Sequence, residues 1–173
     1  PAMAYALAAD PDTRAEILDQ LSVHRDPLIR HLVGRHPQLS AHTLRLLAHD
    51  RAPLVHRALV ERPRLPADIL TTLVQTYTTR PRRAQAATEI LTRLGGHRVT
   101  PRHALIRLYT LGRRHPYPRL LEALARNPNT PPTILTQLGH TPTPELSTAL
   151  IQNPATPGPL RLHLQLTTPS AEV

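Results

Sequence analysis

Residues 124–138 read LARNPNTPPTILTQL, a stretch that predicts where one helix stops and the next one begins. Asparagine before proline disfavours helical backbone and can turn the chain through its own side chain, so Asn127-Pro128 is predicted to end a helix. Threonine before proline is typical of a helix start, because its hydroxyl can accept a backbone N–H while proline has none to satisfy. Thr130-Pro131 is therefore predicted as an N-cap, and the apolar residues behind it as a helix of about ten residues.

The same pattern recurs around a proline that we call the anchor. The anchors are Pro11, Pro37, Pro63, Pro128 and Pro154. Pro11, Pro37 and Pro63 stand 26 residues apart, and so do Pro128 and Pro154. This spacing indicates one small structural repeat copied in tandem. A leucine stands ten residues after every anchor, at Leu21, Leu47, Leu73, Leu138 and Leu164. Asparagine or aspartate precedes three of the anchors, and Thr100-Pro101 and Thr156-Pro157 offer further candidate N-caps.

Each repeat is predicted to contain two short antiparallel helices. The second helix begins at a proline sixteen residues after the anchor, at Pro27, Pro53 and Pro144. Helices this short are marginal in water, so neighbouring repeats must stack to bury an aliphatic core. The sequence therefore predicts an all-α fold of about six helix-pair repeats in a single domain over residues 5–166. Residues 1–4 are interpreted as a cloning remnant or a disordered start, and residues 167–173 as a flexible tail.

The stretch from 124 to 138 resembles the leucine-rich repeat variant family, whose repeats read A-x-N-P-x-T-P-x-x-L-L-x-x-L. The resemblance covers roughly residues 5–166, with His36-Pro37 and Arg62-Pro63 departing from the family's asparagine while the leucine positions are kept. It implies a right-handed superhelical α-solenoid, similar to HEAT repeats, in which α-helices alternate with short α or 3₁₀ helices. Some family members carry a cysteine-bound iron–sulfur cluster, which this chain cannot form because it has no cysteine.

Composition excludes several classes of function. The absence of cysteine rules out disulfides and thiolate metal sites, and makes a reducing compartment the default. No run approaches the roughly 18 apolar residues of a membrane span, and no signal-peptide pattern opens the sequence. Eleven histidines lack metal-ligand spacing, and most acidic residues fall at helix starts. We therefore predict a cytoplasmic protein with no catalytic residue, no cofactor and no metal.

The repeat spacing fails between Pro63 and Pro128, which lie 65 residues apart. Treating Arg98 as an anchor gives spacings of 35 and 30 residues, so one repeat carries insertions on both sides. Residues 80–119 of this irregular repeat contain ten arginines and one acid, Glu89, for a formal charge of +9, whereas the rest of the chain has eleven of each. Insertions in repeat proteins map to one face, often the binding face, so function is expected here.

This basic segment predicts an anionic partner. The candidate residues for such binding are Arg80, Arg82, Arg83, Arg98, Arg102, Arg113, Arg114 and Arg119. A structural explanation is favoured for four other arginines, since arginine at the end of a helix complements the helix dipole. Those four are Arg35, Arg62, Arg93 and Arg126.

Two functional hypotheses follow. The first is a non-enzymatic scaffold that binds a protein or peptide on a concave surface formed by the second helices, as a monomer or as a homodimer through an uncapped end. The candidate contact residues of that surface are His31, His56, Arg57 and Glu122. The second is sequence-independent binding of nucleic-acid backbone by the basic segment. Stacking on single-stranded bases is disfavoured, because the chain has four tyrosines and neither phenylalanine nor tryptophan.

Overall fold

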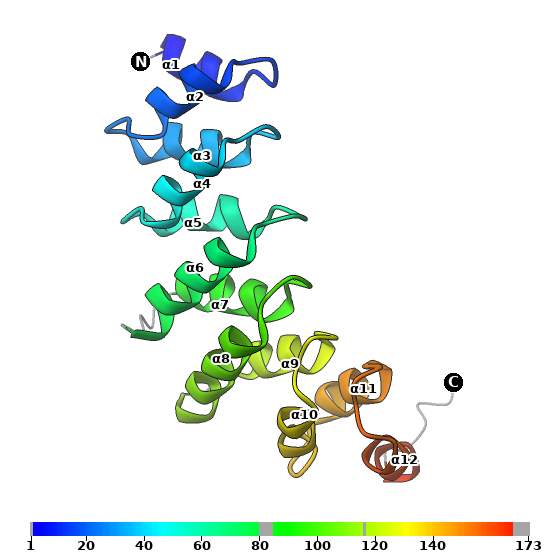
Figure 1. Cartoon of the computed structure of the whole chain (residues 1–173). Helices are drawn as coiled ribbons and strands as arrows, with labels where there is room; N and C mark the ends of the chain where they lie inside the picture. The colour runs from blue at the N-terminus through cyan, green and yellow to red at the C-terminus, as the bar shows by residue number, and fades with distance from the viewer. Residues whose placement is uncertain (1, 80–84, 116, 168–173) are drawn as a thin grey trace. The chain divides into compact units, whose positions relative to one another are not determined.

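The computed structural model describes residues 2–79, 85–115 and 117–167 (Figure 1). These residues form twelve α-helices and no strand, which confirms the all-α prediction. The helices are α1 (Ala2–Ala9), α2 (Ala15–Leu21), α3 (Pro27–Arg35), α4 (Ala41–Ala48), α5 (Pro53–Val60), α6 (Ala67–Thr79), α7 (Gln85–Gly96), α8 (Arg102–Arg114), α9 (Pro118–Arg126), α10 (Pro132–Leu138), α11 (Pro144–Gln152) and α12 (Gly158–Thr167).

The anchors set the register of these helices. Every even-numbered helix begins four residues after a predicted anchor, including α8, which begins four residues after Arg98. The predicted starts of second helices at Pro27, Pro53 and Pro144 are confirmed, each proline being the first helical residue. Proline suits that position because its missing N–H would have no partner in the first turn. At the N-terminus, α1 begins at Ala2, so the alanine-rich start of the chain is helical and not disordered.

The predicted threonine N-caps are wrong at Thr100-Pro101 and Thr130-Pro131. Thr100 and Thr130 are buried, and their hydroxyls donate to the carbonyls of Leu94 and Leu124, six residues earlier, at 2.7 and 2.6 Å. The hydroxyl therefore satisfies a carbonyl at the end of the preceding helix, where the last turn leaves acceptors without partners. Thr143, which also precedes a proline, does cap a helix, because its hydroxyl accepts a hydrogen bond from the N–H of Leu146.

Packing divides the chain into two compact units: unit 1 extends to Ile90, and unit 2 begins at Leu91, inside α7. In unit 1, α3 packs between α1 and α5, and α4 packs on α5 and α6. In unit 2, α9 packs on α8 and α11, and α11 packs on α12. The core of each unit is largely aliphatic, as predicted. Four of the five leucines ten residues after an anchor are buried: Leu47, Leu73, Leu138 and Leu164.

Candidate functional site

One face of α8 carries the strongest concentration of exposed positive charge in the described part of unit 2. Arg102, Arg107, Arg113 and Arg114 are all exposed. At 3.6 residues per turn they lie within an arc of about 140°. The opposite face is buried against the core and includes Leu105. Helix α8 therefore separates a leucine face from an arginine face, and the burial of the first fixes the exposure of the second.

Arg107 was not among the arginines predicted to bind an anion, whereas Arg98 and Arg119, which flank this helix, were. Arg98 is exposed in the turn before α8, where its carbonyl accepts a hydrogen bond from the side-chain amide of Asn129 at 2.5 Å. Arg119 is exposed in the first turn of α9, at the same end of α8 as Arg114. We call these six arginines the basic surface: Arg98, Arg102, Arg107, Arg113, Arg114 and Arg119. Arg80, Arg82 and Arg83, also predicted to bind an anion, lie outside the described residues.

The basic surface is not neutralised by the described part of the chain. None of its six arginines forms an ion pair with a described acidic residue, and the guanidinium of Arg113 instead lies 6.0 Å from the ring centre of Tyr109. The described residues of unit 2 contain nine arginines and only two acids, Glu122 and Glu145, for a formal charge of +7. A like-charged cluster of this kind creates a positive potential that extends about 8 Å into physiological salt. The arrangement can attract a polyanion.

The second predicted set, on the odd-numbered helices, is less available to a partner. His56 is buried at 3 % exposure, and its Nδ1 lies 2.9 Å from the hydroxyl of Tyr77, so its prediction as a surface contact was wrong. Burial of this ring follows from the stacking of α5 against its neighbours, which sequence spacing alone did not reveal. His31 is half-buried, with Nδ1 2.9 Å from the carbonyl oxygen of Leu54. Neither histidine is a freely exposed contact.

The two charged members of this set have partners within the chain. Arg57 is exposed and pairs with Glu61 at 3.2 Å and with Glu89 at 3.5 Å. Glu122 is half-buried and pairs with Arg126 at 3.5 Å. A partner that used these groups would have to compete with existing ion pairs.

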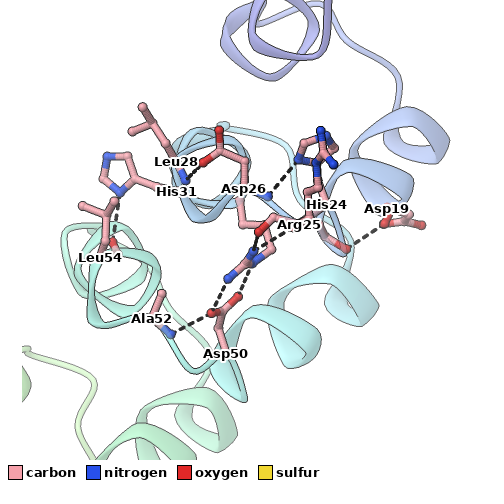
Figure 2. Close-up of polar contacts among 11 residues, drawn as sticks. Asp19, His24, Arg25, Asp26, Leu28, His31, Asp50, Ala52 and Leu54 are labelled. Carbon is pink, nitrogen blue, oxygen red and sulfur yellow. Dashed lines mark hydrogen bonds and ion pairs between the residues drawn. The ribbon is translucent and has the colours of Figure 1, made fainter. Parts of the chain in front are cut away.

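Unit 1 contains a partly buried polar centre that the sequence did not single out (Figure 2). Nε and an Nη of Arg30 donate to the two carboxylate oxygens of Asp50 at 2.6 and 2.9 Å, and a second Nη donates to the carbonyl of His24 at 2.7 Å. Burial alone would raise the pKa of Asp50, but the hydrogen bonds from Arg30 and from the N–H of Ala52 outweigh it and hold that pKa below its ordinary value. The centre joins α3 to the turn after α4 and is structural.

A neighbouring carboxylate serves as a helix cap. Asp26 accepts from the N–H of Leu28 at 2.9 Å, as Figure 2 shows, and from the hydroxyl of Tyr5. The hydrogen bond from Tyr5 is the main reason that the pKa of Asp26 lies below its ordinary value, and the same bond raises the pKa of Tyr5. Both carboxylates are thus committed to the fold and are poor candidates for acid–base chemistry.

The side chains before four of the anchors form a ladder between neighbouring repeats. Buried Asn153 donates to the carbonyls of Ala125 and Asn127 at 2.6 and 2.9 Å, and Asn127 in turn donates to the carbonyls of Gly95 and His97 at 2.8 and 3.0 Å. Each asparagine also accepts from a backbone N–H two residues later. These bonds satisfy carbonyls at the end of the preceding repeat's helix, which would otherwise be buried without partners.

Unit 1 uses different residues at the same position of the ladder. A guanidinium nitrogen of Arg62 donates to the carbonyls of Gly34 and His36 at 3.1 and 2.5 Å, and Nε2 of His36 lies 3.2 Å from the carbonyl of Asp10. Burial lowers the pKa of Arg62. The polar residue before every anchor was the sequence signal that could have revealed the ladder. We call His36, Arg62, Asn127 and Asn153 the ladder residues.

Across residues 2–79, 85–115 and 117–167, no three histidine, aspartate or glutamate side chains gather as a metal site would require. No described helix is long and apolar enough to cross a membrane. No family model, curated protein or solved structure matches this chain.

Proposed function

We propose that the chain is a non-enzymatic scaffold of the cytoplasm, built as a right-handed, HEAT-like α-solenoid of about six helix pairs and related to the leucine-rich repeat variant family. The regular start of each even-numbered helix four residues after an anchor supports a repeated architecture. The ladder residues support it further, because side chains at equivalent positions make equivalent bonds to the preceding repeat.

We propose that the partner is a protein carrying an acidic segment, and that it binds the basic surface of unit 2. The observation that carries this proposal is the set of six exposed arginines without a described acidic partner. Arginine is suited to such a role because its guanidinium can donate two parallel hydrogen bonds to one carboxylate. The odd-helix set supports a partner less well, since its histidines are partly or fully buried and its charged groups are paired.

A binding titration with a labelled acidic peptide tests the proposal. The fluorescence anisotropy of a 20-residue glutamate-rich peptide should rise on addition of the native chain. The double variant Arg107→Glu/Arg114→Glu should weaken binding at least tenfold, because it replaces attraction by repulsion at two positions of the surface. The matched control is Arg14→Glu/Arg51→Glu, which makes the same change of net charge at two exposed sites of unit 1. Equal weakening by both variants would mean that only net charge matters.

Nucleic-acid backbone is the second candidate partner. From Arg102 to Arg114 the helix rises about 18 Å, a length that can follow several phosphates of a duplex. The aromatic residues argue for a duplex and against a single strand, because Tyr77, Tyr109 and Tyr117 are buried, with exposures of 4, 8 and 7 %. Random duplex DNA should then bind with an affinity that falls steeply between about 50 and 200 mM salt. Absence of binding at 50 mM salt, with the acidic peptide still bound, would remove this candidate.

A further inference from the structure

A pocket of about 460 Å³ opens in unit 2 beside the C-terminal end of α8. Helix α8 contributes Tyr109 and Arg113 to its wall, α9 contributes Leu121, and α10 and α11 contribute Leu138 and Leu146. The pocket therefore lies where four helices of one unit approach each other. No sequence pattern predicted it, because its lining residues come from separate repeats.

The pocket combines an apolar floor with a polar rim. Leu138 and Leu146 form the floor and are 5 and 6 % exposed, while Leu121 is half-buried. His140 and Gln137 are exposed at the rim, and their side chains form no hydrogen bond to any described residue. The rim thus has donors and acceptors available for a ligand, and the floor has leucine surface that an apolar group would cover.

Charge at the rim comes from the basic surface. Arg113 lines the pocket itself, and Arg114 follows it on the exposed side of α8. The contact of Arg113 with the ring of Tyr109, at 6.0 Å, holds the guanidinium near the mouth, since a cation is attracted to the face of an aromatic ring. Its N–H groups remain able to donate to a carboxylate. Positive charge and apolar surface therefore lie side by side.

We propose that this pocket is an anchor site for an acidic peptide: one apolar side chain of the peptide enters between Leu121, Leu138 and Leu146, and a neighbouring carboxylate pairs with Arg113. The proposal rests on the proposed function and specifies the partner's chemistry, an aliphatic or aromatic residue flanked by aspartate or glutamate. A nucleic acid fits less well, because Tyr109 is buried at 8 % exposure and its ring is in contact with Arg113, so it offers no open platform for a base.

Two labelled peptides test this inference on the native chain. Both are 15-residue, glutamate-rich sequences that differ only at the central position, which is leucine in one and serine in the other. The leucine peptide should bind about tenfold more tightly, because its side chain leaves water for the pocket while the charges are unchanged. Equal affinities would overturn the anchor site while leaving the acidic-partner proposal in place. Failure of both peptides to bind would overturn both proposals together.

A pair of variants locates the effect. Leu121→Trp should fill the pocket and reduce the tenfold preference to less than twofold, whereas Leu46→Trp, at a 38 % exposed leucine of α4 in unit 1, should leave the preference unchanged. Circular dichroism checks that both variants keep their helices. A preference that survives in a folded Leu121→Trp variant would place the peptide's apolar residue elsewhere and overturn the assignment. Should that variant not fold, Gly112→Ala provides a second test, since a Cβ there would lie 2.8 Å from Leu121 and displace its side chain.

Discussion

Units 1 and 2 share the same succession of helix pairs but use their charges differently. The described residues of unit 1 contain nine arginines and nine acids and are formally neutral, and several of these groups join one helix to another, as in the Arg30–Asp50 pair. The described residues of unit 2 carry +7, and the ladder residues there are neutral asparagines. The difference teaches that the six arginines of the basic surface form no ion pair with a described acidic residue, so they remain available for a partner.

The largest effect is expected from the partly buried ion pair of unit 1, Arg30–Asp50. Asp50→Ala removes the carboxylate that accepts two hydrogen bonds from Arg30 and leaves a guanidinium of 16 % side-chain exposure without it. The free energy of unfolding should fall by about 3 kcal/mol, because a largely desolvated charge is left without its partner. Urea denaturation followed by circular dichroism measures this loss.

An exposed pair in the same unit provides the control. Arg45 and Asp68 lie 3.5 Å apart with side-chain exposures of 64 and 56 %, so Asp68→Ala should cost at most about 0.5 kcal/mol. Equal losses for the two aspartates would show that burial does not set the value of the Arg30–Asp50 pair.

The next largest effect concerns the neutral ladder of unit 2. Asn153→Ala removes two donated hydrogen bonds and leaves the carbonyls of Ala125 and Asn127 without that donor, which should cost about 2 kcal/mol. Asn129→Ala is the matched control, because Asn129 is exposed and donates one bond, to the carbonyl of Arg98. Thermal unfolding of the two variants should separate them clearly. A control as destabilised as Asn153→Ala would contradict a special role for the ladder.

Acidification should destabilise unit 1 more than unit 2. The loss of stability should be smaller than the one expected for Asn153→Ala. The pKa of Asp50 is lower in the folded chain than the value of about 3.9 for an unfolded aspartate, so the unfolded state binds protons first. The stabilisation is complete above that value and is lost as the pH falls through the folded pKa. Stability of the native chain should therefore drop below about pH 4, and Asp50→Ala should show a shallower drop. Parallel pH profiles for the two proteins would assign the acid sensitivity to other groups.

The smallest effect should come from the basic surface. Arg107→Gln/Arg114→Gln changes two exposed residues without described acidic partners, so the free energy of unfolding should change by less than about 0.5 kcal/mol. Differential scanning calorimetry of this variant checks the value, and the acidic-peptide titration should show weaker binding in the same protein. A marked loss of stability would mean that these arginines support the fold after all.

Regular features of the fold could be predicted because they depend on local sequence. Proline at the start of a helix and a leucine at fixed spacing determine where helices begin and which face is buried. Helix α8 begins four residues after Arg98, just as the other even-numbered helices begin four residues after their anchor prolines. The threonine caps could not be predicted reliably, since the same hydroxyl of Thr130 can accept a bond from the next helix or donate to the previous one. The structure shows the second.

Contacts between repeats could not be predicted from the local sequence. Arg30 and Asp50 lie 20 residues apart and meet only because α3 packs beside the turn that follows α4. The burial of His56 likewise depends on Tyr77, 21 residues away. The peptide pocket could not be predicted either, because its lining residues come from four helices that are brought together only by packing. For the basic surface, the sequence supplied the arginines and their periodicity, while their exposure and their lack of described acidic partners required the structure.

The ladder also bears on how such a chain can lengthen or shorten during evolution. Its donors bond to main-chain carbonyls, which every residue type provides, so a duplicated or deleted copy needs no matching change in its neighbour. Asn153 reaches carbonyls 28 and 26 residues earlier, whereas Asn127 reaches carbonyls 32 and 30 residues earlier, across the enlarged repeat. The same joint therefore tolerates inserted segments. New loops can be acquired and tested by selection without rebuilding the interfaces that hold the copies together.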